Sequence, residues 1–571
     1  MQLLDWLVIG VFCAALIGIV VWVIRQKQNN SADYFLGGRD ATWIAIGASI
    51  FASNIGSEHL IGLAGAGASS GMAMAHWEIQ GWMILILGWV FVPFYTRSMV
   101  YTMPEFLERR YNPQSRTILS VISLLSYVLT KVAVTVYAGG LVFQQVFDIK
   151  TLWGIDFFWI AAIGLVLLTA LYTVLGGMKS VLYTSVLQTP ILLLGSLIIL
   201  VLGLKELGGW DEMIRICGGV TVNEYGDTMN NLIRSNSDSN FPWLGALIGS
   251  AIIGFWYWCT DQYIVQRALS GKNEREARRG TIFGAYLKLL PVFLFLIPGM
   301  IAFALHQKNL DSGGFLPLLA DGMKPNADSA FPVLVAKLLP AGVKGLVVCG
   351  ILAALMSSLA SLFNSSAMLF TIDFYKRFRP RTPERKLVFI GQIATVAIVV
   401  LGILWIPIMR SVGDVLYTYL QDVQSVLAPG IAAAFLLGVC WKRTSAAGGM
   451  WGLLAGMIIG LTRLGAKVCY SSAGIEAGST GITGAGSLFK YLFYDLNWLF
   501  FCGWMFLFCV IVVVLVSYAT PAPSAEKIRG LVFGTATRQQ KIDTRASWNR
   551  WDIIHTAIII GITVAFYIYF W

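Results

Sequence analysis

Charged residues are scarce in this sequence. Asp, Glu, Lys and Arg make up 12% of its 571 residues, whereas soluble proteins carry about 25%. Apolar runs of about twenty residues, each long enough to cross a bilayer, recur from Leu3 to Trp571. This composition excludes a soluble protein and predicts an all-α polytopic membrane protein. The first run, residues 3–24, has no basic leader and no small-residue cleavage site, so we expect a retained span.

Sequence signals of catalysis are also missing. The chain has no paired carboxylates at catalytic spacing, no nucleophile motif and no phosphate-binding loop. Its eight cysteines include no Cys-x-x-Cys pair and no metal-ligand spacing. These absences argue against an enzyme and leave transport or binding as the function classes to consider.

Positive charge orients the predicted membrane spans. Lys and Arg gather in alternate loops, among them 97–116, 376–386 and 527–545, which places those loops in the cytoplasm. With fourteen spans, both termini then lie outside. The formal net charge of +11 follows from this topology, so it does not indicate a nucleic-acid partner. The predicted spans are 3–24, 41–72, 76–100, 115–147, 155–178, 181–205, 241–268, 279–306, 331–375, 387–409, 412–440, 444–466, 488–518 and 549–571.

The predicted external loops give two further expectations. Loops 206–240 and 307–330 contain no Asn-x-Ser/Thr glycosylation site, which favours a bacterial protein and hence the bacterial inner (plasma) membrane. Cys217 and Cys469 lie in polar segments on this external side. They could form a disulfide if the compartment is oxidising, or they could be two unrelated thiols.

Two predicted spans are interrupted by polar residues. The second is broken at 53–59, and the seventh is broken at 254–263, "GFWYWCTDQY". Interrupted helices at corresponding positions of two halves point to a transporter site, and the odd five-span offset makes the halves inverted repeats. Unwound backbone in lipid leaves carbonyl groups that a hard cation can satisfy. Ala52 and Ile55 are therefore candidate carbonyl ligands.

Hydroxyl groups that could complete a cation site lie in the ninth predicted span. Ser357 and Ser358 are adjacent, and Ala354 lies one turn earlier on the same helix face. The alternative is that these serines bond to their own helix or to a neighbouring one.

Charged side chains inside the spans mark a second candidate site. Glu78 and Lys288 are intramembrane charges, which usually face a cavity or a partner, although each could instead be an interfacial side chain. Gln421 lies near a span end, and His59 taken alone could be a buried structural histidine.

An aromatic run accompanies these polar residues. Trp256, Tyr257 and Trp258 precede Asp261 and Gln262. A sugar suits such a set, because its C–H face stacks on aromatic rings while its hydroxyls need donors and acceptors. Aromatic residues also form belts at membrane interfaces, which is the alternative interpretation.

Several long stretches resemble a known family, the sodium/glucose cotransporter branch of the sodium:solute symporter family. The likeness runs from about Asp33 to Arg443 and rests on "DYFLGGRDATWIAIGASIFASNIGSEHLIGLAGAGASSG", "YTMPEF", "ALYTVLGGM", "WYWCTDQYIVQR", "YLKLLP", "LMSSLASLFNSSAMLFTIDFY" and "FLLGVCWKR". The resemblance implies a LeuT-like core of five-plus-five inverted repeats and alternating access. We expect one transporter domain over 1–571, comprising a peripheral first helix (1–30), the repeat core (41–440) and peripheral C-terminal helices (444–571).

The resemblance also implies roles for particular residues. Tyr257 matches an inner gate that stacks on the sugar, and Cys217 and Cys469 fall in loops that some animal members join by a disulfide. The positions that match the sugar pocket are Asn54, His59, Glu78, Tyr257, Trp258, Lys288 and Gln421. Those that match the outer hydrophobic gate are Leu63, Trp77 and Tyr417. Those that match the sodium site are Ala52, Ile55, Ala354, Ser357 and Ser358.

The sequence departs from the family pattern at two sites. The family's second sodium site uses an Asp and a Thr where this chain has Ser185 and Ala360, so we expect one Na⁺ per sugar. Gly254 stands where sugar-transporting members often have Thr or Asn, and Gly81 likewise offers no hydroxyl. We therefore expect a roomier pocket, or one that reads a different hydroxyl.

The predicted function is sodium-coupled symport of a monosaccharide, a glucose- or galactose-type hexose. One alternative keeps the fold and changes the cargo to myo-inositol, sialic acid or another polyol. A second alternative is a sugar sensor or sodium-leak protein without net transport. The predicted partners are the sugar, Na⁺ and the lipid bilayer.

Overall fold

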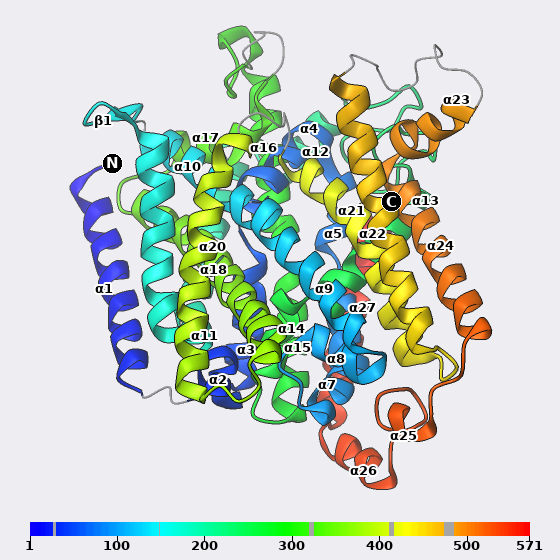
Figure 1. The fold of residues 1–571 in the computed structure, drawn as a ribbon. Helices are drawn as coiled ribbons and strands as arrows, with labels where there is room; N and C mark the ends of the chain where they lie inside the picture. The colour runs from blue at the N-terminus through cyan, green and yellow to red at the C-terminus, as the bar shows by residue number, and fades with distance from the viewer. Residues whose placement is uncertain (27–29, 57, 148, 319–324, 410–415, 473–484) are drawn as a thin grey trace.

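The chain folds into a bundle of helices that stand roughly side by side, with short helices and loops at both ends (Figure 1). The computed structural model describes residues 1–26, 30–56, 58–147, 149–318, 325–409, 416–472 and 485–571. The only strands in these ranges, β1 (Thr151–Leu152) and β2 (Ile155–Asp156), pair antiparallel in a small hairpin.

The α-helices follow one another with short connections. Those of the first part are α1 (Leu3–Arg25), α2 (Ser31–Leu36), α3 (Trp43–Asn54), α4 (Ala64–Ser70), α5 (Ala75–Glu78), α6 (Gly81–Ile86), α7 (Val92–Ser98), α8 (Met103–Arg110), α9 (Pro113–Ser126), α10 (Ala133–Phe147), α11 (Phe157–Leu207) and α12 (Trp210–Gly218). The middle part contains α13 (Trp243–Phe255), α14 (Gln262–Leu269), α15 (Glu274–Lys288), α16 (Ile297–Lys308), α17 (Ala330–Leu338), α18 (Val343–Met368), α19 (Lys376–Phe378), α20 (Glu384–Met409) and α21 (Leu416–Cys440). The last part contains α22 (Ala446–Ser472), α23 (Ala485–Lys490), α24 (Trp498–Ala519), α25 (Ala525–Ile528), α26 (Arg538–Ala546) and α27 (Arg550–Tyr569).

Several helices contain or adjoin wider π-helical turns. These are η2 (Glu58–Leu63), η4 (Leu87–Phe91), η5 (Tyr127–Val132), η6 (Trp256–Thr260), η7 (Val292–Leu296), η10 (Leu369–Tyr375) and η11 (Tyr491–Asp495). Such turns often occur at functional positions. Two of them, η2 and η6, lie in the segments that the sequence predicts to be interrupted. Short 3₁₀ turns are η1 (Gly37–Arg39), η3 (Gly71–Met74), η8 (Leu310–Ser312) and η9 (Ala327–Ser329).

Helix boundaries differ from the prediction in two places. Among the described residues, 11 helices are long and apolar enough to cross a membrane. The predicted fifth and sixth spans form one helix, α11, which bends at Gly177 (φ +53°); a side chain there would overlap the carbonyl of Tyr34. The predicted ninth span is two helices, α17 and α18, separated by a turn that contains Gly342 (φ +83°).

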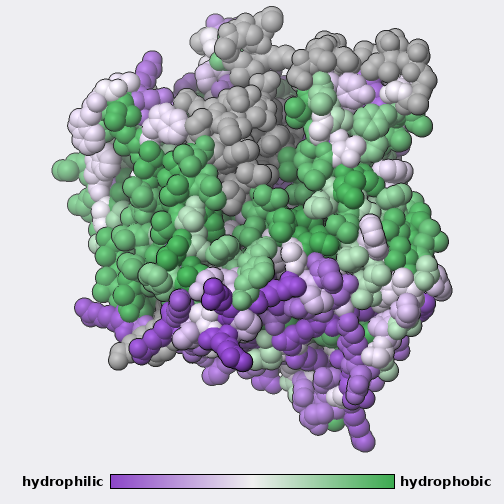
Figure 2. Space-filling model, viewed as in Figure 1, coloured by the Kyte–Doolittle hydropathy of each residue, from purple (hydrophilic) through white to green (hydrophobic). Residues whose placement is uncertain are grey.

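Burial separates central from outer helices. In the most apolar stretch of residues 343–378, which contains α18, 89% of residues are buried, against 22% for α1 and for α27. Figure 2 shows apolar side chains over the flanks of the bundle and hydrophilic ones along its lower edge, where Figure 1 places α2, α8 and α26. The N-terminus lies at the opposite end of the bundle (Figure 1).

The outer helix α1 is tied to the central helix α18 by one carboxylate. Asp5 Oδ1 accepts hydrogen bonds from the backbone N–H groups of Gly342 and Gly345, at 2.7 and 2.8 Å. These N–H groups lie at the first turn of α18, where a helix leaves its donors unpaired. Asp5 is 1% exposed, so this side chain of α1 serves as the N-terminal cap of α18.

Candidate functional site

The first interruption is a true break in the helix. α3 ends at Asn54, and Ile55 has extended backbone angles (φ −80°, ψ 110°). The helical path resumes at Glu58 with η2 and continues in α4. The side chains of Asn54 and His59, on either side of the break, are both buried and both line one cavity. The prediction of a discontinuous second helix is confirmed.

The second interruption lies at Asp261. α13 continues into η6, Asp261 is extended (φ −75°, ψ 127°), and α14 starts at Gln262. The Asp261 carboxylate accepts hydrogen bonds from Tyr127 and from Lys131 Nζ, the latter at 2.7 Å. The Gln262 carboxamide accepts one from the backbone of Met103 at 2.8 Å. Asp261 and Gln262 therefore stabilise the break and do not line the cavity, contrary to the suggestion that they serve a sugar.

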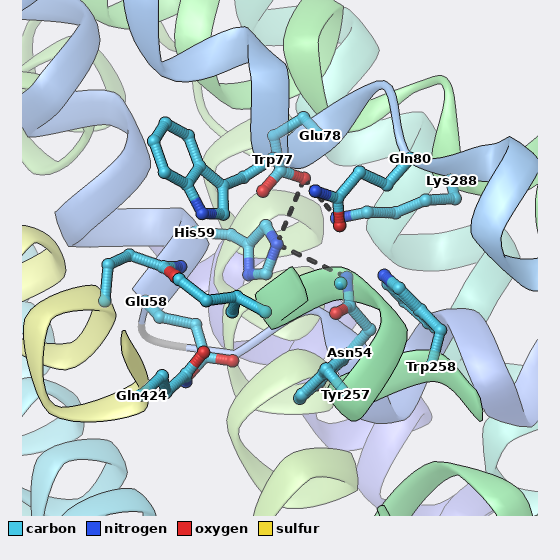
Figure 3. A pocket seen from close by; sticks show the side chains of 13 residues that line it. Asn54, Glu58, His59, Trp77, Glu78, Gln80, Tyr257, Trp258, Lys288 and Gln424 are labelled. Carbon is cyan, nitrogen blue, oxygen red and sulfur yellow. Dashed lines mark hydrogen bonds and ion pairs between the residues drawn. The ribbon is translucent and has the colours of Figure 1, made fainter. Parts of the chain in front are cut away.

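A small polar cavity lies between the two breaks (Figure 3). Its volume is about 40 Å³, enough for water but below the roughly 300–1,000 Å³ of small-molecule sites. The site is therefore contracted in this conformation and must widen to admit a sugar. All seven predicted sugar-pocket residues line it: Asn54, His59, Glu78, Tyr257, Trp258, Lys288 and Gln421.

Four of these side chains form one ionic network. Lys288 Nζ donates to Glu78 Oε2 at 2.6 Å and lies 5.3 Å from the centre of the Trp258 ring. His59 Nε2 lies 3.3 Å from Glu78 Oε2 and 3.3 Å from the Asn54 amide nitrogen. Since both charges are at least 95% buried, each needs the other to offset its desolvation. The pair gives the cavity polar groups without net charge, which suits a neutral polyhydroxy ligand.

Three buried polar atoms at the cavity have no hydrogen-bond partner among the described residues. They are the Tyr257 hydroxyl, Gln421 Oε1 and Trp77 Nε1. Buried polar atoms are almost always hydrogen-bonded, because an unpaired one costs about 1–3 kcal/mol. The set contains a donor, an acceptor and a hydroxyl that can act as either. A ligand that carries several hydroxyl groups would satisfy all three.

Four further residues line the cavity that sequence reasoning did not assign: Glu58, Gln80, Ile253 and Gln424. Glu58 and Gln424 lie on the side of the cavity away from Lys288 (Figure 3). Glu58 is next to His59 in the interrupted segment, so its position beside the break was a usable signal. Gln424 lies one turn after Gln421 on α21, and this i, i+3 spacing places both on one helix face.

The two glycine departures have a different outcome from the one expected. A Cβ on Gly81 would point at Ala285 of α15 and Ile559 of α27, away from the cavity, so Gly81 does not shape the pocket. Gly254 does line the cavity, but the pocket is not roomier there. The Gln80 carboxamide fills the space beside Gly254.

The predicted gate residues lie in different surroundings. Trp77 stacks on Trp498 (ring centres 5.5 Å apart, 24° between planes) and lines the cavity. Leu63 is fully buried at the end of η2 and is not among the cavity residues. Tyr257 lies between the cavity and Tyr263, whose ring centre is 6.2 Å away. Tyr417 lies in the first turn of α21, and its side chain is outside the described part of the chain.

The predicted sodium site brings α3 and α18 together. Ser358 Oγ donates to the carbonyls of Ser53 and Ile55, at 2.8 and 3.3 Å. The hydroxyl and the Ile55 carbonyl are thus adjacent oxygen atoms, the ligand type that hard cations prefer. Ala52 and Ala354, the remaining backbone candidates, are both 1% exposed in the same two helices.

Ser357, the other predicted hydroxyl ligand, belongs to a neutral serine cluster. Its Oγ lies 3.4 Å from Ser185 Oγ, which in turn lies 3.5 Å from Ser49 Oγ. Ser185 Oγ also donates to the Val181 carbonyl at 2.6 Å. Among the described residues, no group of three or more His, Cys, Asp or Glu side chains is arranged to hold a metal ion.

Cys217 and Cys469 are not bonded to each other. Cys217 is a free, buried thiol whose Sγ contacts the Met300 carbonyl at 3.9 Å. Cys469 is exposed on α22. The disulfide expected for these two residues is therefore wrong for this structure, because Cys217 is packed inward against α16 instead of facing α22.

Known proteins share both the sequence and the fold of this chain. The sodium:solute symporter family matches residues 34–456. Sodium/myo-inositol cotransporter 2 of Mus musculus is 37% identical over 552 residues, which cover 94% of this chain and 80% of that protein. Sodium/glucose cotransporter 4 of Danio rerio is 34% identical over 565 residues (95% and 83%).

A solved structure supports the predicted fold class. A Na⁺-coupled sialic acid symporter in a substrate-bound outward-open state aligns with a TM-score of 0.72 at 22% identity, over 92% of this chain and 99% of that one. The likeness confirms the predicted LeuT-like fold.

Proposed function

Because the chain belongs to the sodium:solute symporter family, we propose that the solute it moves is a hexose of the glucose or galactose type. The coarser activity, sodium-coupled solute symport with Na⁺ as the coupled ion, follows from the family. The proposal concerns the cargo and the residues that bind it.

One observation carries the choice of a sugar. The cavity combines a neutralised Glu78–Lys288 pair, the rings of Tyr257 and Trp258, and three unpaired polar atoms. A pyranose offers hydroxyls for the polar atoms and a C–H face for a ring. myo-Inositol, also a six-carbon ring of hydroxyls, is the second candidate, and the naming of the Mus musculus relative supports it equally.

The sodium site gives the proposed coupling a physical basis. Ser358 now uses its hydroxyl proton to satisfy the Ser53 and Ile55 carbonyls. Bound Na⁺ would take over that role, with the Ser358 oxygen and the Ile55 carbonyl as ligands. Since Asn54 and His59 flank the same break, ordering the break around Na⁺ also orders two sugar ligands. This is coupling of two ligands through one element.

We place both termini on the external side of the membrane. The C-terminal Phe570 carbonyl accepts a hydrogen bond from Leu232 in the segment 206–240, at 2.9 Å, and the N-terminus lies at the end of the bundle opposite the hydrophilic edge (Figures 1 and 2). Basic loops at that edge would face the cytoplasm. We assign the protein to the plasma membrane on the same grounds, as a bacterial inner-membrane protein.

The test is uptake of labelled glucose, galactose and myo-inositol into proteoliposomes, with and without an inward Na⁺ gradient. We expect Na⁺-dependent accumulation of a hexose, lost in Ser358→Ala and in Gln421→Ala. Ser366→Ala is the matched control, because this buried serine also lies on α18 and its hydroxyl makes no hydrogen bond among the described residues. Accumulation of myo-inositol alone would replace the hexose, and Na⁺-dependent binding without any accumulation would indicate a sensor.

A further inference from the structure

Gln80 occupies a junction between two helices at the cavity. It lies in the turn between α5 and α6, two residues after Glu78, and is 3% exposed. Its side chain lies beside Lys288 and Glu78 in the view of the site (Figure 3). Nothing in its local sequence, "HWEIQGW", distinguishes it from an ordinary helix-end glutamine.

The Gln80 side chain is fixed by the backbone of α13. Its Nε2 donates to the Ser250 carbonyl at 2.8 Å. Ser250 lies one turn before Gly254, so the carboxamide rests directly against the glycine. A Cβ on Gly254 would overlap the Gln80 carboxamide. A side chain at 254 and the present position of Gln80 therefore exclude each other.

The carboxamide keeps hydrogen-bonding capacity for a ligand. An amide has two N–H donors and an oxygen with two lone pairs, and the Ser250 carbonyl uses one donor. Among the described residues, Gln80 makes no other hydrogen bond. A buried site that is built to pair with a hydroxyl rejects an analogue that lacks it, because the amide is then left unpaired.

We propose that Gln80 is a specificity-determining residue of the substrate site: its carboxamide takes the place of a side chain at position 254 and hydrogen-bonds one ring hydroxyl of the substrate. The inference rests on the proposed function, since it requires a polyhydroxy substrate in this cavity. It names the pair Gln80–Gly254 as the part of the pocket that selects among six-carbon sugars and cyclitols.

The experiment is a four-variant cycle of wild type, Gln80→Ala, Gly254→Ala and the double variant. Competition of monodeoxy analogues against the accumulated substrate is measured in proteoliposomes. In wild type we expect one deoxy analogue to compete about tenfold more weakly than the parent sugar. In Gln80→Ala that penalty should shrink to less than about threefold, while the other analogues keep their order. Gly254→Ala alone should weaken the parent sugar, and the double variant should bind it better than Gly254→Ala does.

The control is Gln392→Ala. Gln392 also donates its amide to a backbone carbonyl, that of Val174 at 3.1 Å, but it lies on α20 and does not line the cavity. An equal loss for every analogue in Gln80→Ala, or independent effects of the two substitutions, would overturn the inference. Absence of accumulation of any sugar or cyclitol by the wild type would instead overturn the proposed function, so the two failures are distinguishable.

Discussion

The hydroxyl of Tyr263 donates a hydrogen bond to the backbone carbonyl of Ser53, one residue before α3 ends. The same carbonyl accepts from Ser358 Oγ, and the Tyr263 ring faces that of Tyr257, with ring centres 6.2 Å apart. Tyr263 therefore contacts both the predicted sodium site and the predicted inner gate. It joins the two interrupted segments at the point where each is broken.

Removing this hydroxyl should weaken sodium binding. In Tyr263→Phe the unwound backbone loses one anchor, so Na⁺ must order it at a cost of about 1 kcal/mol, or about fivefold in affinity. The measurement is the Na⁺ concentration for half-maximal uptake. Tyr111→Phe is the control, since Tyr111 donates to the Ala434 carbonyl at 2.7 Å, away from the cavity. Equal half-saturation in both variants would contradict the role of Tyr263.

Breaking the buried Glu78–Lys288 pair should destabilise the protein. Either Glu78→Gln or Lys288→Met leaves an uncompensated charge, with an expected loss of about 3–5 kcal/mol in the free energy of unfolding. The double variant should recover most of that stability while sugar binding stays weak, because the hydrogen-bonding groups are lost.

Thermal unfolding in detergent, paired with a sugar-binding assay, checks this prediction. Glu212 and Arg215 form an exposed pair on α12, and their substitution should leave unfolding unchanged because exposed pairs contribute little. Single variants of Glu78 and Lys288 that unfold with the wild type would show that the pair does not stabilise the fold.

Stoichiometry can be read from electrical measurements. One charge gains about 2.3 kcal/mol per 100 mV, and a tenfold Na⁺ gradient adds about 1.4 kcal/mol. At about 150 mV, one Na⁺ supplies about 5 kcal/mol, or between three and four decades of accumulation. The neutral cluster of Ser49, Ser185 and Ser357 leads us to expect one charge per sugar. A reversal potential that requires two charges would refute this expectation.

The external segment 206–240 should lose stability in acid. Burial raises the pKa of Asp238, but hydrogen bonds from the backbone of Phe241 and Asn240 and from the Asn223 side chain outweigh it and leave the pKa below its usual value. A lowered pKa in the folded state stabilises the protein at neutral pH, and this contribution disappears as pH falls through that pKa. The melting-temperature difference between wild type and Asp238→Asn should therefore be largest near pH 7 and shrink below about pH 4. Asp211→Asn, at an exposed position on α12, is the control, and a constant difference would contradict the linkage.

The thiol of Cys217 should remain unlinked in the isolated protein. Alkylation of unfolded protein without reductant, followed by proteolysis and mass spectrometry, should find alkylated Cys217 and no peptide that joins it to Cys469. A crosslinked peptide would show that the external segment can rearrange enough to bring Cys217 out of its contact with Met300.

Much of the fold was predictable because membrane spans are long apolar runs. Breaks at 53–59 and 254–263 were visible as polar residues within such runs. The continuity of α11 was not, since Gly177 can equally end a helix or bend one. The family match also confirms that the chain is not an enzyme.

The site was predicted less evenly. Positions carried over from the resemblance all line the cavity, whereas Gln80 and Gln424 lie on helices whose sequence does not separate a cavity face from a packing face. The use of Asp261 by Lys131 joins residues 130 positions apart, and no local pattern reveals such a pairing. Gly81 failed for the same reason: which neighbour a glycine faces depends on the packing of α15 and α27.

The carboxylate of Asp5 makes the outermost helix part of the working core. Shortened versions of membrane proteins are often made by trimming a helix that touches little else, and α1 would invite such a deletion. Removing it would also remove the cap on the first turn of α18, the helix that carries Ser357 and Ser358 some four turns further on. A truncated protein would then fray at that end and hold the ion-binding serines less firmly, so it would report on a damaged transporter.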